Sequence, residues 1–529
     1  MDFDLIIVGM GPVGATAANL AGQRGLKTLV VDKAAALYPN PRAIGLDHEV
    51  MRVFSEIGIA AEIAPFVMPY RASEYRNAES RLLKRIEAAR KPYPLGWVPN
   101  YVFVQPEIER VLREKVVADP NVEVMLETEA TAVDQSGDAC VVSLRSQDGT
   151  VRTVVSRFVL ACDGGASPLR TAAGVALEDL EFDEPWLVVD VMLKEGAGAS
   201  LPETNVQYCE VARPCTFVVG VGQHRRWEFM INPDENPVDV AKPEFIATLI
   251  DRWLKPEEYT LWRASTYRFH ALVAAEWRTG NMFFLGDAAH MTPPFLAQGL
   301  CQGIRDASNL IWKLALVIGG RADERLLESY QEERSAHVKK TTLVAKQFGQ
   351  VICERDPVTA EERDRRLMQE MAAHPQGIVR QSLIPGLASG YLAGGQFQAQ
   401  GELLPQSEVE DAAGCRGLMD AFSGNGFRLI ASADVDVVAA HHEIESNPDL
   451  AGIPIRVVKL AKEVTEELRL ADVLADINGV VSDWMTAKRC TVVLARPDHY
   501  VFGVGNGGTD AVGLLRSAGA ALRQATEPA

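Results

Sequence analysis

The feature that most constrains the fold is a glycine-rich turn close to the start of the chain. The segment Gly9-Met-Gly-Pro-Val-Gly14 matches the pattern G-x-G-x-x-G. It follows the apolar run Asp4–Val8 and precedes the helix-forming segment Ala15–Ala21, and a second apolar run, Thr28–Val31, ends beside Asp32. Strand, glycine turn, helix and strand within about 30 residues make a βαβ unit.

Each part of this turn has a physical reason. One glycine allows the tight turn, one lets the backbone approach a pyrophosphate, and one lets helix and strand pack closely. Free N–H groups at the helix N-terminus bind phosphate oxygens, and an acid after the second strand accepts hydrogen bonds from ribose hydroxyls while disfavouring a 2′-phosphate. The pattern predicts a dinucleotide site, FAD or NAD, at Gly9, Gly11, Pro12, Val13, Gly14, Asp32 and Lys33.

Two more aspartates follow apolar strands. Asp163 comes after Arg157–Ala161, and Asp287 comes after Met282–Leu285. Carboxylates at the C-terminal ends of parallel strands lie where open α/β sheets bind ligands. A single aspartate in such a place is more often a turn former or a helix cap. Three strand-end sites, each with small residues beside the acid, favour one shared ligand.

These motifs resemble those of the single-component (group A) flavoprotein aromatic hydroxylases. Asp163-Gly164 is similar to the DG motif of that family, and Gly286-Asp287 to its GD motif, whose acid contacts the ribityl chain of FAD. The stretch Pro293–Gly303 is similar to the segment that follows the GD motif. Two positions depart from the family pattern, because Ala297 stands where glycine is usual and Asp32 where many relatives carry glutamate.

The resemblance implies that the cofactor is FAD. Beyond the glycine turn, it implies cofactor contacts at Arg42, Gln105, Asp163, Gly164, Gly286, Asp287, Pro294, Gln298, Gly299, Leu300 and Cys301. The turn at Gln298-Gly299 is expected to aim helix N–H groups at the N1–C2 edge of the flavin, where they stabilise the negative charge of the reduced form. From the residues alone, the preferred interpretation of Arg42 is a solvated loop charge, and that of Gln105 is the N-terminal residue of a helix.

Further segments resemble the branch of the family that contains 3-(3-hydroxyphenyl)propionate hydroxylase, namely Phe182–Val191, Arg226–Met230 and Tyr267–His270. That branch implies hydroxylation of a phenolic aromatic acid in aromatic catabolism. NADH or NADPH reduces FAD, O₂ adds at flavin C4a, and the flavin hydroperoxide transfers oxygen to the ring. The alternatives are a hydroxylase of another phenol (resorcinol-type or polyketide) and a flavin-binding protein without turnover. NADH oxidation across a panel of phenols separates them.

A phenol reacts best as phenolate, so a residue is expected to handle the phenolic proton. His48 is the candidate, because its ordinary pKa near 6.5 suits the task; packing beside the flavin is the other interpretation. His290 is expected to be a buried structural histidine bonded to backbone. Candidate substrate contacts are Tyr208, Arg225, Arg226, Tyr267 and Pro293, with sheet packing as the alternative role for each.

The expected fold class is α/β (α+β), with a Rossmann-like FAD-binding domain, an inserted antiparallel-sheet substrate domain and a C-terminal thioredoxin-like domain. The expected bounds are 1–180 and 273–390 for the FAD-binding domain, 181–272 for the insertion and 391–529 for the last domain. Strand-like pieces at Leu187–Leu193, Phe217–Val221 and Trp227–Ile231 predict the antiparallel sheet. Helices are expected over Gly299–Ile318, Ala322–Val351 and Asp510–Thr526.

Composition excludes several classes of function. A net charge of −18 argues against nucleic-acid binding, and eight scattered cysteines without a C-x-x-C pair give no support to a metal site or a dithiol. Such cysteines favour reduced thiols and the cytoplasm. The first strand leaves no room for a signal peptide, and no apolar run approaches the roughly 20 residues of a membrane span. The expected partners are a small phenol, O₂ and NAD(P)H, for a monomer or homodimer.

Overall fold

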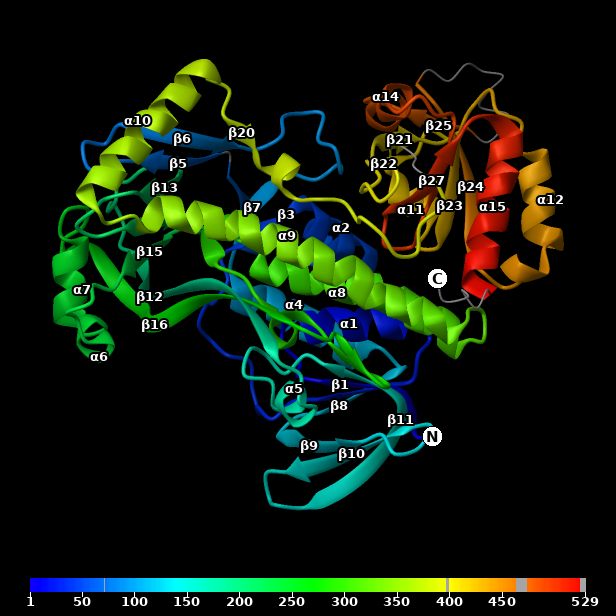
Figure 1. Cartoon of the computed structure of the whole chain (residues 1–529), viewed down its shortest axis with the longest axis horizontal. Coiled ribbons are helices and arrows are strands. Elements are labelled where there is room, and N and C mark those ends of the chain that lie inside the picture. The colour runs from blue at the N-terminus through cyan, green and yellow to red at the C-terminus, as the bar shows by residue number, and fades with distance from the viewer. Residues whose placement is uncertain (71, 396–398, 463–472, 524–529) are drawn as a thin grey trace.

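The computed structural model describes residues 1–70, 72–395, 399–462 and 473–523. Figure 1 shows a region around β1 and α1 below, a sheet around β12 and β16 on the left, and a C-terminal region around α12 and α15 on the right. The long helices α8 (Gly299–Ile318) and α9 (Glu328–Cys353) run across the middle of the molecule. None of the helices in these described ranges has both the length and the apolarity needed to cross a membrane.

The first sheet has a parallel core with the strand order β18-β11-β1-β2-β8. Its strands are β1 (Phe3–Val8), β2 (Thr28–Val31), β8 (Val122–Met125), β11 (Val151–Ala161) and β18 (Met282–Phe284). All four residues of β2 are buried, as expected of a strand covered on both faces. Val8 pairs with Ala161, which pairs with Phe284, so β1, β11 and β18 end side by side.

This register brings the three sequence motifs to one edge of the sheet. The glycine turn leaves β1 and opens α1 (Pro12–Gln23), Asp163 follows β11, and Asp287 follows β18. An antiparallel extension of β11 is formed by β9 (Thr128–Asp134) and β10 (Cys140–Ser146), and α4 (Gln105–Ala118) packs against α1.

The second sheet has nine strands in the order β19-β16-β12-β15-β14-β13-β5-β6-β20. Its five central strands are β12 (Leu177–Leu193), β13 (Asn205–Tyr208), β14 (Cys215–Val219), β15 (His224–Met230) and β16 (Tyr259–Ala274). The outer strands come from elsewhere in the chain: β5 (Ala72–Arg76), β6 (Leu82–Glu87), β19 (His290–Met291) and β20 (Ile378–Val379). The sheet therefore draws on more of the chain than 181–272, and the domain bounds stay a prediction.

A small sheet links these two regions. It contains β3 (Gly45–Asp47), β7 (Asn100–Phe103) and β4 (Val67–Pro69), and it leads into α2 (His48–Ile57). The Asp47 side chain caps α2 by accepting hydrogen bonds from the N–H groups of Glu49 and Val50, and the left-handed Gly58 ends the helix.

The C-terminal region is a separate α/β unit with the strand order β22-β21-β25-β24-β23-β26-β27. Its strands are β21 (Glu408–Glu410), β22 (Arg416–Leu418), β23 (Phe427–Ser432), β24 (Ile455–Ala461), β25 (Val473–Asp476), β26 (Val492–Ala495) and β27 (Val501–Gly505). Helices α12 (Val438–Ser446) and α15 (Gly507–Arg523) lie side by side against it, and α14 (Val480–Ala487) lies at its upper end (Figure 1).

The helix predictions hold with small changes. The helix expected over Gly299–Ile318 is α8. The helix expected over Ala322–Val351 begins later, because Asp323 caps a separate 3-10 turn, Glu324–Leu327, before α9 starts. The helix expected over Asp510–Thr526 is α15, and its last three expected residues lie outside the described residues. A further helix, α10 (Pro357–Ala373), was not predicted.

Candidate active site

The edge where β1, β2 and β11 end borders a cavity of about 270 Å³, called here the nucleotide cavity. Its wall includes Gly9, Gly11, Asp32, Lys33, Arg42, Asp163 and Gly164. These residues were predicted to bind one dinucleotide, and they border one space. The prediction that each contacts the cofactor stays a prediction.

Two glycines of the turn, Gly9 and Gly14, are packed against backbone atoms, whereas Gly11 borders open space. Gly9 has φ +99°, and a Cβ there would lie 2.4 Å from the carbonyl oxygen of Cys162. A Cβ at Gly14 would lie 1.9 Å from the carbonyl oxygen of Gly9, so glycine is required for α1 to start against the turn. A Cβ at Gly11 would meet no atom within 4 Å. The open side therefore faces the nucleotide cavity at the N-terminus of α1, which fits a pyrophosphate.

Asp32 also fixes the turn. Its Oδ2 accepts a hydrogen bond of 2.7 Å from the N–H of Met10, and its Oδ1 accepts one of 2.8 Å from the N–H of Ala34. Arg113 of α4 forms an ion pair of 3.7 Å with it. The carboxylate thus joins the end of β2 to the glycine turn while it lines the nucleotide cavity.

Asp163 has the capping role that single strand-end aspartates often have. Its carboxylate accepts hydrogen bonds from the hydroxyl of Ser167 (2.6 Å) and the N–H of Leu169 (3.2 Å), at the start of α5 (Pro168–Ala172). Gly164, with φ +84° and no atom within 4 Å of a Cβ position, lies beside it at the cavity wall. Asp163 therefore shapes the wall by holding this turn.

The turn that carries Asp287 is held from behind by Asp306 of α8. The Asp306 carboxylate accepts hydrogen bonds from the N–H of Gly286 (2.9 Å), and from Arg334 of α9 (2.9 Å). Gly286 and Ala288 are buried, whereas the side chain of Asp287 between them is exposed. A Cβ on Gly286 would lie 2.9 Å from the side chain of Val13 in α1, so Gly286 packs closely against α1.

His290 is structural, as predicted, but with a different partner. It is fully buried, its ring stacks on Trp277 with centroids 5.4 Å apart, and its Nε2 lies 2.9 Å from the Asp306 carboxylate. The expected partner was a backbone group. The partner of His290 is instead the buried carboxylate of Asp306, which also accepts the N–H of Gly286.

A second cavity of about 250 Å³, called here the inner cavity, lies between one face of the nine-stranded sheet and the segment Thr292–Leu300. Arg42 lines both cavities. The N-terminus of α8 borders the inner cavity at Gly299, where a Cβ would meet only one atom, at 4.0 Å. The unpaired N–H groups of a first helical turn attract negative charge. Gly299, Leu300 and Pro294, which were predicted to contact the cofactor, line this cavity, and the contact itself stays a prediction.

Two cross-strand rows of side chains lie on the sheet face toward the inner cavity, and all their members except the buried Asp190 line it. In the first row, Gln207 pairs with Thr216, which pairs with Glu228. In the second row, Val218 pairs with Arg226, which pairs with Asp190, which pairs with Arg263. Side chains of one face alternate along each strand, so these rows follow directly from the register.

Asp190 organises the charged row. It accepts hydrogen bonds from Arg226 Nε (2.7 Å) and Nη2 (3.1 Å), and its Oδ1 lies 2.8 Å from His224 Nε2. Burial alone would raise the pKa of Asp190, but the Arg226 guanidinium and these hydrogen bonds outweigh burial and lower it. Arg263 lies 3.7 Å from the same carboxylate.

Arg226, a predicted substrate contact, lines the inner cavity but its guanidinium has other partners. Beyond Asp190, it donates hydrogen bonds to the carbonyl oxygens of Arg42 (2.7 Å) and Pro41 (3.2 Å). Arg263 also donates to the carbonyl oxygen of Pro41. Both arginines therefore hold the loop that carries Arg42, and Gln105 holds it too, because its Oε1 accepts the N–H of Arg42 at 3.0 Å.

Glu228 and Arg380 line the inner cavity and were not predicted. Glu228 is buried with an oxygen 3.9 Å from Arg226 Nη1, and burial, reinforced by Asp190, raises the pKa of this carboxyl to about 7. Arg380 is buried and donates hydrogen bonds to the Tyr70 hydroxyl and the Leu296 carbonyl. Glu228 lies two residues after Arg226 in β15, so the two side chains face the same side of the sheet. This spacing is visible in the sequence and could have predicted Glu228.

Tyr208 points to the other face of the sheet. Asn205 and Gln207 face the inner cavity, whereas Tyr208 packs on Trp253 behind α7 (Pro243–Ile250), with ring centroids 5.4 Å apart. The structure therefore places this candidate substrate residue away from the cavity, because it alternates with its neighbours. Tyr267 does line the cavity, with the Arg263 guanidinium 5.1 Å from its ring centroid.

Four more candidates lie just behind the cavity wall. Pro293 is buried between the lining residues Thr292 and Pro294. Gln298 is fully buried and bonds to Asp47 and Arg305, and the thiol of Cys301 lies 3.5 Å from the Ala297 carbonyl. His48 is buried at the start of α2, outside the residues that line either cavity. Burial lowers the pKa of His48 to about 4, with Arg305 contributing and Asp47 opposing.

Ala297, the departure from the family pattern, has a left-handed backbone with φ +48° and ψ +44°. This region favours glycine and costs other residues about 1 kcal/mol or more. The methyl group lines the inner cavity, and it lies 2.8 Å from the place that a Cβ on Gly45 would take. The loop therefore keeps the shape that glycine would give it, at a cost in stability.

Comparisons with known proteins agree with this geometry. Residues 2–345 match the family model described as FAD binding domain, and residues 401–516 match the HcaD C-terminal domain. The chain is 33% identical to a probable NADH-specific resorcinol 4-hydroxylase of Rhodococcus jostii, covering 98% of this chain and 95% of that protein. It is 31% identical to a 3-(3-hydroxy-phenyl)propionate/3-hydroxycinnamic acid hydroxylase of Burkholderia vietnamiensis, covering 96% and 94%.

Solved structures show the same fold at low identity. The flavin-dependent monooxygenase PieE in complex with FAD and substrate has a TM-score of 0.81 at 19% identity, over 99% of both chains. Aklavinone-11 hydroxylase with FAD and aklavinone has a TM-score of 0.78 at 20% identity, over 98% of this chain and 99% of that one. Strand-end motifs, two adjoining cavities and full-length similarity lead to one conclusion: this chain belongs to the family of single-component, FAD-dependent aromatic hydroxylases.

Proposed function

We propose that this FAD-dependent hydroxylase acts on a phenolic aromatic acid, such as 3-(3-hydroxyphenyl)propionate, with NAD(P)H and O₂ as co-substrates. The observation that carries the proposal is an excess of positive charge at the inner cavity. Arg226, Arg263 and Arg380 line it, and Asp190 is the buried carboxylate paired with the first two. In the parts of the chain that the structure describes, Arg380 forms no ion pair with a carboxylate.

Buried positive charge in excess favours an anionic ligand, because a guanidinium with no counter-charge is costly to bury. Glu228 offsets this excess only partly, since its pKa of about 7 leaves about half of it protonated in neutral solution. A carboxylate on the substrate supplies the missing negative charge. A ring carrying only hydroxyl groups does not, and this difference favours the acid over a resorcinol-type phenol.

FAD, once reduced by the nicotinamide, supplies the activated oxygen that is transferred to the ring. The chain supplies the surroundings. Gly11 leaves open space in which the pyrophosphate would lie, Gly9 and Gly14 allow the tight turn behind it, and Asp32 lines the same cavity, where it would bind the ribose. The N-terminal turn of α8 borders the inner cavity, where its N–H groups would stabilise charge at the flavin edge. Apolar lining residues such as Phe295 and Leu296 keep water from the reacting oxygen.

Glu228 is the group proposed to accept the phenolic proton. It lines the inner cavity, and a pKa of about 7 suits a general base in neutral solution. His48 is the second candidate for this role. Its pKa of about 4 keeps it neutral but makes it a weak base, and it lies behind the residues that line the cavity. Replacing Glu228 and His48 in separate variants distinguishes the two candidates, because the pKa of the true base sets the acidic limb of the profile of kcat/KM against pH.

The deciding experiment compares three compounds: 3-(3-hydroxyphenyl)propionate, its uncharged amide, and resorcinol. We expect a dihydroxy product from the acid, with kcat/KM at least about tenfold above that of the amide. Resorcinol turned over in preference to the acid would contradict the proposed substrate and leave the hydroxylase class intact. Both products are identified by mass spectrometry, because NADH oxidation alone does not prove oxygen transfer.

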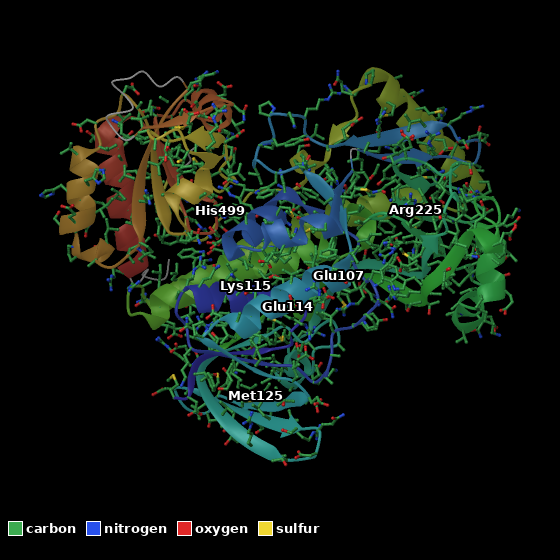
Figure 2. All side chains as sticks on the ribbon, turned by 180° about the vertical axis from the view of Figure 1, so that it is seen from behind. Glu107, Glu114, Lys115, Met125, Arg225 and His499 are labelled. Atoms are coloured by element: carbon green, nitrogen blue, oxygen red, sulfur yellow. The ribbon has the colours of Figure 1, made fainter. Side chains whose placement is uncertain are left out.

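A variant pair tests the charge argument. Arg380→Met removes a buried guanidinium and is expected to raise KM for the acid while KM for the amide changes little. Arg225→Gln is the matched control: Arg225 lies in β15 next to Arg226 but does not line the inner cavity, and it donates to the carbonyls of Gly222 and His224 (Figure 2 labels it in the sheet). Equal effects of the two variants on KM for the acid would contradict the charge argument.

The cytoplasm is the proposed location, supported by eight cysteines that are all free thiols. The proposed assembly is a monomer or homodimer. Light scattering on the FAD-loaded protein measures the mass directly, and a trimer or larger assembly would contradict this part of the proposal.

A further inference from the structure

The loop Arg496–Tyr500, between β26 and β27, is one of the segments through which the C-terminal region contacts the rest of the molecule. All five of its residues are buried, although Arg496, Asp498 and His499 are ionisable. Such turns are normally solvated, and burial of polar groups is costly unless each has a partner. Figure 2 shows His499 where the C-terminal region meets the helices of the FAD-binding region.

The first part of the loop is anchored on the long helices. Arg496 donates hydrogen bonds to both oxygens of Glu333 in α9, at 2.8 and 2.7 Å. Asp498 accepts a hydrogen bond of 3.0 Å from Asn309 in α8. Burial would raise the pKa of Glu333, but Arg496 and Lys313 outweigh burial and lower it to about 2. These contacts hold the loop rigidly against α8 and α9.

The last residue of the loop leads toward the inner cavity. Tyr500 donates a hydrogen bond of 3.0 Å from its hydroxyl to Oε1 of Glu49 in α2. The other oxygen of Glu49 accepts a hydrogen bond from Arg305 of α8. Burial, reinforced by Glu49, raises the pKa of Tyr500 well above its usual range, so the hydroxyl stays a donor.

Arg305 connects Glu49 to the residues at the start of α8. It donates a hydrogen bond of 2.9 Å to Oε1 of Gln298 and one of 2.6 Å to Oδ2 of Asp47. Gln298 in turn donates one of 3.1 Å to the same Asp47 oxygen. Gln298 immediately precedes α8, and its neighbours Ala297 and Gly299 line the inner cavity.

We infer that Tyr500 is a positioning residue for the flavin site, through which the C-terminal region sets the N-terminal turn of α8. In the described chain, the structure gives Glu49 Oε1 one hydrogen-bond donor, the Tyr500 hydroxyl. Without that donor, the buried carboxylate attracts Arg305 more strongly, and Arg305 is the residue that holds Gln298 and Asp47. The C-terminal region is then part of the cofactor site as well as a packing unit.

The test compares two FAD-loaded variants that each lose one buried tyrosine hydroxyl. Tyr500→Phe removes the bond to Glu49. Tyr391→Phe is the control, because Tyr391 is buried against the C-terminal region and its hydroxyl donates a hydrogen bond of 2.9 Å to the Ala518 carbonyl, away from Glu49. The readouts are the midpoint potential of the bound flavin, the dissociation constant of FAD and the thermal midpoint, all without substrate.

We expect Tyr500→Phe to make the midpoint potential more negative, because a displaced helix turn stabilises reduced flavin less. The FAD dissociation constant should rise about tenfold. Tyr391→Phe should lower only the thermal midpoint. A Tyr500→Phe protein with unchanged potential and affinity, or equal shifts in both variants, would overturn the inference. Because no substrate is present, these outcomes do not depend on the proposed phenolic acid.

A second variant covers the case in which Tyr500→Phe does not retain FAD. Glu49→Gln keeps the size of the side chain and removes its charge, so Arg305 is drawn less strongly away from Gln298 and the potential should shift in the opposite direction, becoming less negative. The double variant should have the potential of Glu49→Gln alone, since Tyr500 acts through the charge of Glu49. Additive shifts would show that Tyr500 acts by another route, and that result also overturns the inference.

Discussion

Replacement of Glu228 by glutamine is expected to stabilise the protein and to slow it. Burial raises the pKa of this carboxyl from an ordinary value of 4.5 to about 7. One pKa unit corresponds to about 1.4 kcal/mol, so the ionised carboxylate costs the folded state about 3 kcal/mol relative to the unfolded chain. Glutamine has nearly the same size and carries no charge, and it removes this cost.

The gain depends on pH in a definite direction. Below pH 4.5 the carboxyl is protonated in both states, and the cost is absent. Between pH 4.5 and 7 the unfolded chain releases the proton while the folded protein keeps it, so the wild-type protein loses stability as the pH rises. Above pH 7 the loss is complete. Glu228→Gln should therefore gain little at pH 5 and up to about 3 kcal/mol at pH 8.

Urea denaturation of the FAD-loaded proteins at pH 5 and pH 8 measures this difference. Glu123→Gln, at an exposed position of β8, serves as the control and should give no gain that grows with pH. In the same samples, Glu228→Gln should lower kcat/KM for the phenol by about 10²- to 10⁴-fold at pH 8. A stability gain of equal size at the two pH values would refute the raised pKa, and a stabilised variant with unchanged kcat/KM would refute the role as base.

Three further substitutions test the geometry of the site. Ala297→Gly should raise the free energy of unfolding by about 0.5–1 kcal/mol, since it relieves a left-handed backbone at φ +48°, and urea denaturation measures it. Arg226→Lys should lower that free energy by about 3 kcal/mol and release FAD more readily on gel filtration, because lysine cannot replace the fork that bonds Asp190 and two carbonyls. Tyr208→Phe should leave KM for the phenol unchanged in steady-state kinetics, since its ring lies on the far face of the sheet.

The cofactor half of the site could be predicted because its determinants are local. A glycine turn, a strand and an acid lie within a few residues of one another, and parallel strands end at a common edge. That rule alone brings Gly9, Asp163 and Asp287 to neighbouring strand ends, as the pairing of Val8 and Phe284 with Ala161 shows. The motif did not reveal that Asp163 also caps α5, since that needs the conformation of the next turn.

The substrate half could be predicted less well, because it is built by strand register and distant segments. Glu228 meets Thr216 and Val188 only through pairing across three strands, and Arg380 reaches Tyr70 across 310 positions of sequence. Alternation along β13 was a usable signal, since polar Asn205 and Gln207 share one parity and Tyr208 has the other. Tyr208 became a candidate because its side-chain chemistry was considered without asking which face of the sheet it lies on.

Asp190 explains why the two halves form one site. It is a fully buried carboxylate, and it binds Arg226 while lying near Arg263, so it orients both arginines toward the carbonyls of Pro41 and Arg42. Arg42 lines both cavities. The carboxylate of the proposed substrate would compete with Asp190 for the same guanidinium groups, and a shift of those groups would move the loop that borders the nucleotide cavity. On the proposed function, we therefore expect substrate charge and cofactor position to be coupled through Arg226 and Arg263.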